Sequence, residues 1–224
     1  MLGIIICQKN QKISSDRIYD FIIKSIKDGK LKPNDRVKEQ DLVEQTGLSR
    51  TPIREALGLL QNDGILVQDG KNGLIVAGLD LISITKLYKI RELLEGEAAK
   101  LAALHSSMAE IEILVNILKV QKNIKELNEL RASNILFHQT LYRCSGNHYL
   151  FKIMENLDRS LLLLGDSTLV KENRPKEAYE EHLAVVNAIK ERNALEAERL
   201  AKFHIQQDKK ILIFYFNFLC SFVT

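Results

Sequence analysis

Two arginines, Arg50 and Arg54, stand four residues apart in a short polar segment. Side chains at this spacing project from one face of a helix, so both guanidinium groups would point the same way. A guanidinium can donate two parallel hydrogen bonds to O6 and N7 of guanine. The hydroxyls of Ser49 and Thr51, beside the free N–H groups of a helix start, suit a phosphate. The segment predicts a helix that reads DNA bases. The alternative is that both arginines are solvated surface charges.

A second group of residues suggests metal chemistry. His138, His182 and His204 fall on three different expected helices, the last two among apolar neighbours, and Asn134 precedes His138 by four residues. Three imidazoles that converge in the core of a bundle can bind a metal and leave a coordination position open. The alternative is that each is an ordinary structural histidine. The remaining two, His105 and His148, match no ligand position.

The arginines need a scaffold, and residues 14–77 suggest one. We expect a helix that begins at Ser14-Ser15-Asp16 and ends at Gly29, a second over 39–46 and a third over 50–62. Ser49 is the expected N-cap of the third helix, whose first turn contains Pro52. Strands over 64–68 and 74–77 would form a hairpin across a Gly/Asn turn. This order predicts a winged helix-turn-helix, in which Lys71 and Gly73 of the wing contact DNA or form a simple turn.

The second half of the chain is helical by its apolar period. A linker at 78–80 separates it from the first half, so we expect a DNA-binding domain over 1–78 and a helical domain over 79–224. The fold class is therefore mainly α, with a bundle of about six helices. These are expected over 81–104, 108–122, 124–144, 147–164, 175–191 and 194–218.

Composition excludes several classes of protein. The 224 residues carry a net charge of +3, and 46% are hydrophobic, which excludes extensive disorder. The three cysteines are far apart, which indicates a reducing cytoplasm, and no apolar run could span a membrane. No HExxH, GxSxG or P-loop motif is present, so we expect no enzyme. The apolar tail 211–224 is interpreted as a packing or self-association surface rather than a membrane contact.

Residues 14–77 resemble the winged helix-turn-helix of the GntR transcription regulators. Gln40 departs from the pattern, because some members place a basic residue there that reaches DNA. The resemblance rests on Leu31-x-Pro33, Glu39-x-x-Leu42, the run from Gly47 to Leu57, Leu60, Asp63-Gly64 and Gly73.

Residues 81–210 resemble the helical FCD ligand domain found in one GntR subfamily. The resemblance rests on 91–95, 98–99, 137–138, 146–147, Leu150, His182 and His204. It implies a divalent metal, Zn²⁺ or Ni²⁺, held by Asn134, His138, His182 and His204, and a small carboxylate effector that completes the shell. The family has Asp where this chain has Asn134, a weaker ligand, so the site either binds metal less tightly or is a metal-free pocket.

These patterns together predict a ligand-responsive repressor that binds a double-stranded DNA operator as a homodimer. Arg91 is the expected partner of the effector carboxylate, and its alternative is a salt bridge to Glu95. Two other functions remain open. The chain could be a metal-dependent enzyme with an accessory winged helix, or a regulator that has lost its response to metal and effector.

Overall fold

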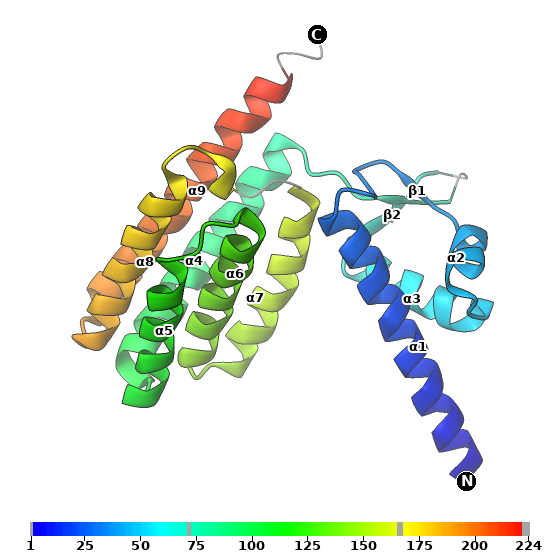
Figure 1. Ribbon diagram of the computed structural model, residues 1–224, viewed down its shortest axis with the longest axis horizontal. Coiled ribbons are helices and arrows are strands. Elements are labelled where there is room, and N and C mark those ends of the chain that lie inside the picture. The colour runs from blue at the N-terminus through cyan, green and yellow to red at the C-terminus, as the bar shows by residue number, and fades with distance from the viewer. Residues whose placement is uncertain (1, 71–72, 165–167, 221–224) are drawn as a thin grey trace. The chain divides into compact units, whose positions relative to one another are not determined.

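The computed structural model describes residues 2–70, 73–164 and 168–220. The chain divides into two compact units, each with its own core (Figure 1). The first comprises the chain as far as Leu79 together with a short segment that starts at Asp158. The second comprises the residues between these two parts and those that follow.

The first unit is a winged helix. Its turn between the second and third helices begins at Gly47, which closes α2 with φ of 66° and donates its N–H to Val43 O. Glycine adopts this left-handed conformation without steric cost. The three strands form an antiparallel sheet in the order β1-β3-β2. The elements are α1 (Leu2–Lys27), β1 (Arg36–Val37), α2 (Glu39–Thr46), α3 (Arg50–Asn62), β2 (Leu66–Gln68) and β3 (Leu74–Val76).

Buried aliphatic side chains hold the winged helix together. Ile18 and Ile22 of α1 pack with Ile53 and Leu60 of α3 in one core cluster, each no more than 1% exposed. The two positions in α1 are four residues apart and those in α3 are seven apart, as expected for the buried stripe of an amphipathic helix. The core therefore fixes the face of α3 that points inward and leaves the opposite face to solvent.

Two expectations about this unit were wrong. The first helix begins at Leu2, so Ser14 and Ser15 lie inside it rather than at its N-terminus. A serine can act as an N-cap only where the residues before it are not helical. Residues 4–14 contain neither proline nor glycine, so nothing stops the helix before the serines. Strand β1 was not expected, because two residues are too few to show an alternating pattern.

The second unit is a helical bundle. Its first helices begin at side-chain caps: Asp80 accepts a hydrogen bond from the Ser83 N–H at 2.7 Å, and Ser107 and Glu110 form a capping box. The 3₁₀-helix η2 (Thr168–Val170) was not expected. The α-helices are α4 (Leu81–His105), α5 (Met108–Gln121), α6 (Leu127–Cys144), α7 (His148–Leu161), α8 (Arg174–Lys190) and α9 (Ala194–Cys220).

The end of α7 and the 3₁₀-helix η1 (Leu162–Leu164) belong to the first unit. Leu163 is part of the winged-helix core, and Arg159 Nη1 lies 2.9 Å from Asp63 Oδ2. Asp63 also accepts a hydrogen bond from Tyr19 Oη at 2.7 Å. Burial and this hydrogen bond raise the pKa of Tyr19 to about 12.

Helices α4 and α9 run side by side in the bundle (Figure 1). At Gly96 an added Cβ would lie 2.6 Å from the side chain of Lys202. Both helices contribute small side chains to the buried core of the bundle, namely Ala98, Ala99, Ala102, Ala103, Ala197 and Ala201. Small residues let the two backbones approach closely, so α4 and α9 form a tightly packed pair.

The prediction of a mainly α protein with a winged helix-turn-helix and a helical bundle is confirmed. Within the described residues, every helix is too short or too polar to cross a membrane. At the apolar tail, Ile211 is buried and Phe214 is 65% exposed. The side chains from residue 217 onward lie outside the described part.

Candidate DNA-reading helix and metal centre

Helix α3 presents its first turns to solvent. Ser49 occupies the N-cap position with extended backbone (φ −68°, ψ 161°), although its side chain makes no capping hydrogen bond. Pro52 is buried in the first turn, while the side chains of Arg50 and Arg54 are 63% and 66% exposed. Thr51 is exposed beside them. The solvent face of α3 therefore carries both guanidinium groups at its N-terminal end.

Helix α2 holds both arginines through acidic and amide groups. Arg54 Nε donates to Glu39 Oε2 at 2.7 Å, and Arg50 Nε lies 3.7 Å from Glu39 Oε1. Arg50 Nη2 donates to Gln40 Oε1 at 3.2 Å, and Gln40 Nε2 donates to Glu44 Oε1 at 3.0 Å. The hydrogen bond from Arg54 lowers the pKa of Glu39. Neither arginine is therefore a free surface charge.

The wing turn is closed by a backbone hydrogen bond beside Gly73. Gly73 precedes β3 with φ of 101°, a conformation that other residues rarely adopt, and its carbonyl accepts the Asp69 N–H at 2.9 Å. This bond closes the turn. Lys71, the predicted contact at the wing tip, lies outside the described residues.

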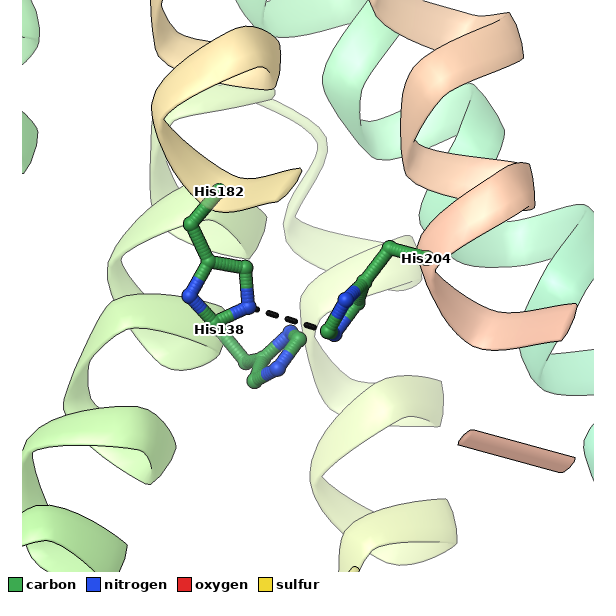
Figure 2. A group of neighbouring side chains, drawn as sticks. All are labelled: His138, His182 and His204. Atoms are coloured by element: carbon green, nitrogen blue, oxygen red, sulfur yellow. Dashed lines mark hydrogen bonds between the residues drawn. The ribbon is translucent and has the colours of Figure 1, made fainter. Parts of the chain in front are cut away.

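Three helices of the bundle bring the predicted histidines together. His138 comes from α6, His182 from α8 and His204 from α9, and one ring nitrogen of each lies within 4.8 Å of the others (Figure 2). The Nε2 atoms of His182 and His204 are 3.2 Å apart. All three side chains are at most 3% exposed. Such a cluster could hold a metal ion.

The remaining hydrogen bonds of these rings determine which nitrogens are available. His138 Nδ1 bonds to Glu95 Oε1, and His204 Nδ1 lies 2.6 Å from Glu181 Oε2. A carboxylate partner at Nδ1 places the proton there and leaves Nε2 as a lone-pair donor. In the described part of the chain, His138 Nε2 and Asn134 Oδ1 are buried without any hydrogen-bond partner. Because a buried lone pair without a partner is costly, a bound cation fits this donor set.

Burial favours the neutral form of His138 and His182, the form that metal ligation requires. It lowers the pKa of His138, and it lowers that of His182 well below its ordinary value. Burial would raise the pKa of Glu95, but His138 and Arg91 lower it to about 2. The ring of Phe137 stacks on His182 at 4.0 Å between centroids and shields it from water.

Glu181 belongs to a buried charge cluster around Arg174, which is 0% exposed. The Arg174 guanidinium donates to both oxygens of Glu181, at 2.8 and 2.7 Å, and to Asp208 Oδ1 at 3.0 Å. Thr168 Oγ1 donates to the same Asp208 oxygen at 2.8 Å. This cluster orients Glu181 and, through it, His204. It was not predicted, although Glu181 precedes one histidine and Asp208 follows the other by one helical turn.

Arg91 is 6% exposed and its Nε lies 3.2 Å from Glu95 Oε2. The structure thus contains the ion pair that the sequence offered as the alternative to effector binding. Glu95 links this arginine to His138, because its other oxygen bonds the imidazole. An effector-binding role for Arg91 stays a prediction.

We expect Arg174→Met to destabilise the protein by about 3–5 kcal/mol, because the buried Asp208 and the partly buried Glu181 would lose their cation. The free energy of unfolding, from urea denaturation followed by circular dichroism, measures this effect. Arg199→Met is the control: Arg199 is 63% exposed and pairs only with Glu196 among the described residues, so its loss should cost no more than about 0.5 kcal/mol. Equal stabilities would show that the cluster contributes little to folding.

Comparison with known proteins agrees with this architecture. Residues 14–76 match the family model described as bacterial regulatory proteins of the gntR family, and residues 86–207 match the FCD domain. The uncharacterized HTH-type transcriptional regulator YdhC of Bacillus subtilis is 30% identical over 86% of this chain and 88% of its own. The regulator LutR of the same organism is 29% identical over 86% and 98%. The solved structure of E. coli McbR/YncC has a TM-score of 0.74 at 23% identity, covering 89% and 96%.

The fold and these relatives define a DNA-binding transcription regulator rather than an enzyme. The chain belongs to the GntR family, in the group whose winged helix is followed by an FCD domain. The resemblance stated from its motifs is therefore confirmed.

Proposed function

We propose that this chain is a repressor that binds an operator through α3 and releases it when a small carboxylate binds the helical domain. The observation that carries the proposal is that one chain has both two exposed arginines at the start of α3 and a buried cluster of three histidines in its FCD domain. We propose residues 1–78 as the DNA-binding domain and 79–224 as the effector domain. Ser49, Arg50, Thr51, Arg54, Lys71 and Gly73 are the proposed DNA contacts.

In the effector domain, the metal ligands would be Asn134 Oδ1 and the Nε2 atoms of His138, His182 and His204. A Zn²⁺ or Ni²⁺ ion there would supply an electrophilic position for a carboxylate oxygen. Three neutral imidazoles and a neutral amide leave the ion's charge uncompensated, which favours an anionic effector. Arg91 is the proposed second contact of that carboxylate, and Glu95 and Glu181 orient two of the ligand rings.

We propose that the operator is read by a homodimer. One recognition helix reaches only a few base pairs, and a two-fold dimer reads two half-sites with adequate affinity. Light scattering on the purified chain should give twice its mass of 25.6 kDa. A monomer that binds a single asymmetric site would contradict this part of the proposal.

The proposal is tested by selecting duplexes from a randomised library with the purified protein. We expect a pseudo-palindromic consensus and an affinity at least 10³-fold above that for random duplex. A panel of small carboxylates is then added with ZnCl₂ or NiCl₂, and at least one should weaken operator binding. Absence of any enriched sequence would overturn the assignment of DNA reading. Enrichment without response to any metal or carboxylate would favour a regulator that has lost its effector response.

We expect Asn134→Asp to tighten Zn²⁺ binding by roughly ten-fold or more, because a carboxylate is a stronger ligand for this ion than an amide. Competition with a chromophoric chelator measures the affinity. Ser133→Asp adds the same charge one position earlier, off the face of α6 that Asn134 shares with His138, and is the control. Unchanged affinity in Asn134→Asp would show that residue 134 does not ligate the metal.

A further inference from the structure

We infer that Glu39 is a specificity-determining residue of the operator complex, one that acts by positioning Arg54 for base contact. This inference rests on the proposed function, because it assumes that α3 reads DNA. It assigns to an acidic residue of α2 a role in a site that would otherwise consist of α3 and the wing.

Arg54 is held by Glu39 at only one of its three guanidinium nitrogens. Its Nε donates to Glu39 Oε2 at 2.7 Å, a short charge-assisted hydrogen bond. Among the described residues, its two Nη groups have no hydrogen-bond partner. A guanidinium held at Nε keeps both terminal nitrogens available side by side, the arrangement that matches O6 and N7 of guanine. Because the side chain is held before DNA arrives, less rotamer entropy is lost on binding.

Arg50 is held differently. Its Nη2 donates to Gln40 Oε1, and Gln40 is itself held by Glu44. Its Nε lies 3.7 Å from Glu39, which is an ion pair without the short hydrogen bond. Only Nη1 has no partner among the described residues, so Arg50 must leave Gln40 before it can offer two parallel donors. Of the two arginines, Arg54 is therefore the one already arranged to donate two parallel hydrogen bonds to a guanine.

The charge of Glu39 adds a second effect. Two guanidinium groups on an exposed helix attract any phosphate, whatever the sequence. Glu39 and Glu44 balance that charge within the same surface, and the side chain of Glu39 remains 26% exposed. A carboxylate near the backbone of non-cognate DNA disfavours binding, whereas the cognate complex gains base contacts that compensate for it. Glu39 therefore raises the ratio of specific to non-specific affinity.

The test compares Glu39→Gln with Asp41→Asn, using the operator selected by the wild-type protein and a random duplex of equal length. Asp41 is exposed in the same first turn of α2, so its change removes the same charge. For Glu39→Gln we expect about two-fold tighter binding to random duplex, at least ten-fold lower discrimination, and relaxed preference at one guanine position in each half-site. Asp41→Asn should leave discrimination within about two-fold of wild type.

Thermal unfolding of both variants is measured alongside, and because the contacts of Glu39 are on the surface we expect little change. Glu39→Asp is the second variant, and it should recover part of the lost discrimination. Discrimination unchanged in Glu39→Gln, or lowered equally by Asp41→Asn, would overturn the inference. Failure of the wild type to select any sequence would instead overturn the proposed function.

Discussion

Replacing Arg50 and Arg54 together by alanine is expected to abolish operator recognition. A bidentate contact between arginine and guanine contributes about 1–3 kcal/mol of discrimination, so each single variant should bind the operator roughly 10- to 100-fold more weakly. Binding to random duplex should fall less, because it lacks those base contacts. Both side chains are more than half exposed, so the fold should persist.

Fluorescence anisotropy with labelled operator measures these affinities at one fixed salt concentration. The matched control is Arg199→Ala, which removes an exposed arginine from α9 in the other unit. If the double variant keeps its preference for operator over random duplex, α3 is not the reading helix. The slope of affinity against salt should also become shallower by about one for each phosphate contact that is lost.

Replacing His182 by leucine is expected to remove the metal. His182 is the best position for this experiment because its Nδ1 has no hydrogen-bond partner among the described residues, whereas His138 and His204 each bond a carboxylate. Removing either of those two would also take a hydrogen-bond partner from a carboxylate and so mix the effect on ligation with an effect on stability. We expect Zn²⁺ affinity to fall at least 100-fold, while the unfolding free energy of the metal-free protein changes little.

Metal content after gel filtration and isothermal titration with ZnCl₂ provide the two readouts. His105→Leu makes the same substitution at an exposed position at the end of α4 and should leave both readouts unchanged. A wild-type protein without metal after incubation with Zn²⁺ or Ni²⁺ would contradict the metal proposal. Equal affinity in His182→Leu would place the ion elsewhere.

The parts of the fold that could be predicted were those with local signals. Helices over 39–46 and 50–62 were predicted with the observed bounds, because Gly47, Ser49 and Pro52 define their ends. The extension of α1 to Leu2 was missed because two serines resembled a start signal. The convergence of the histidines was a hypothesis that relied on family resemblance, because positions 138, 182 and 204 carry no local signal of contact across three helices.

The charged groups behind the site could not be predicted for a different reason. Glu181 follows Glu180, and such acidic pairs on a helix are usually solvated. Only the bundle shows that Glu181 faces Arg174. In the same way, Glu39 was recognised only as part of a family pattern, and its bond to Arg54 spans fifteen positions. Long-range charge pairing depends on tertiary geometry rather than on spacing.

The close packing of α4 on α9 has a mechanical consequence. The buried alanines of α4 and α9 leave few large side chains that could rearrange between the two helices, so the pair should move as one stiff unit. His204 and Glu95 lie on that pair, while His138 and His182 are carried by α6 and α8. If the three histidines move closer together, α6 and α8 should therefore move toward the α4–α9 pair. A larger residue at Gly96, where the side chain of Lys202 already fills the space, would loosen the packing of α4 on α9 and weaken the movement of α6 and α8.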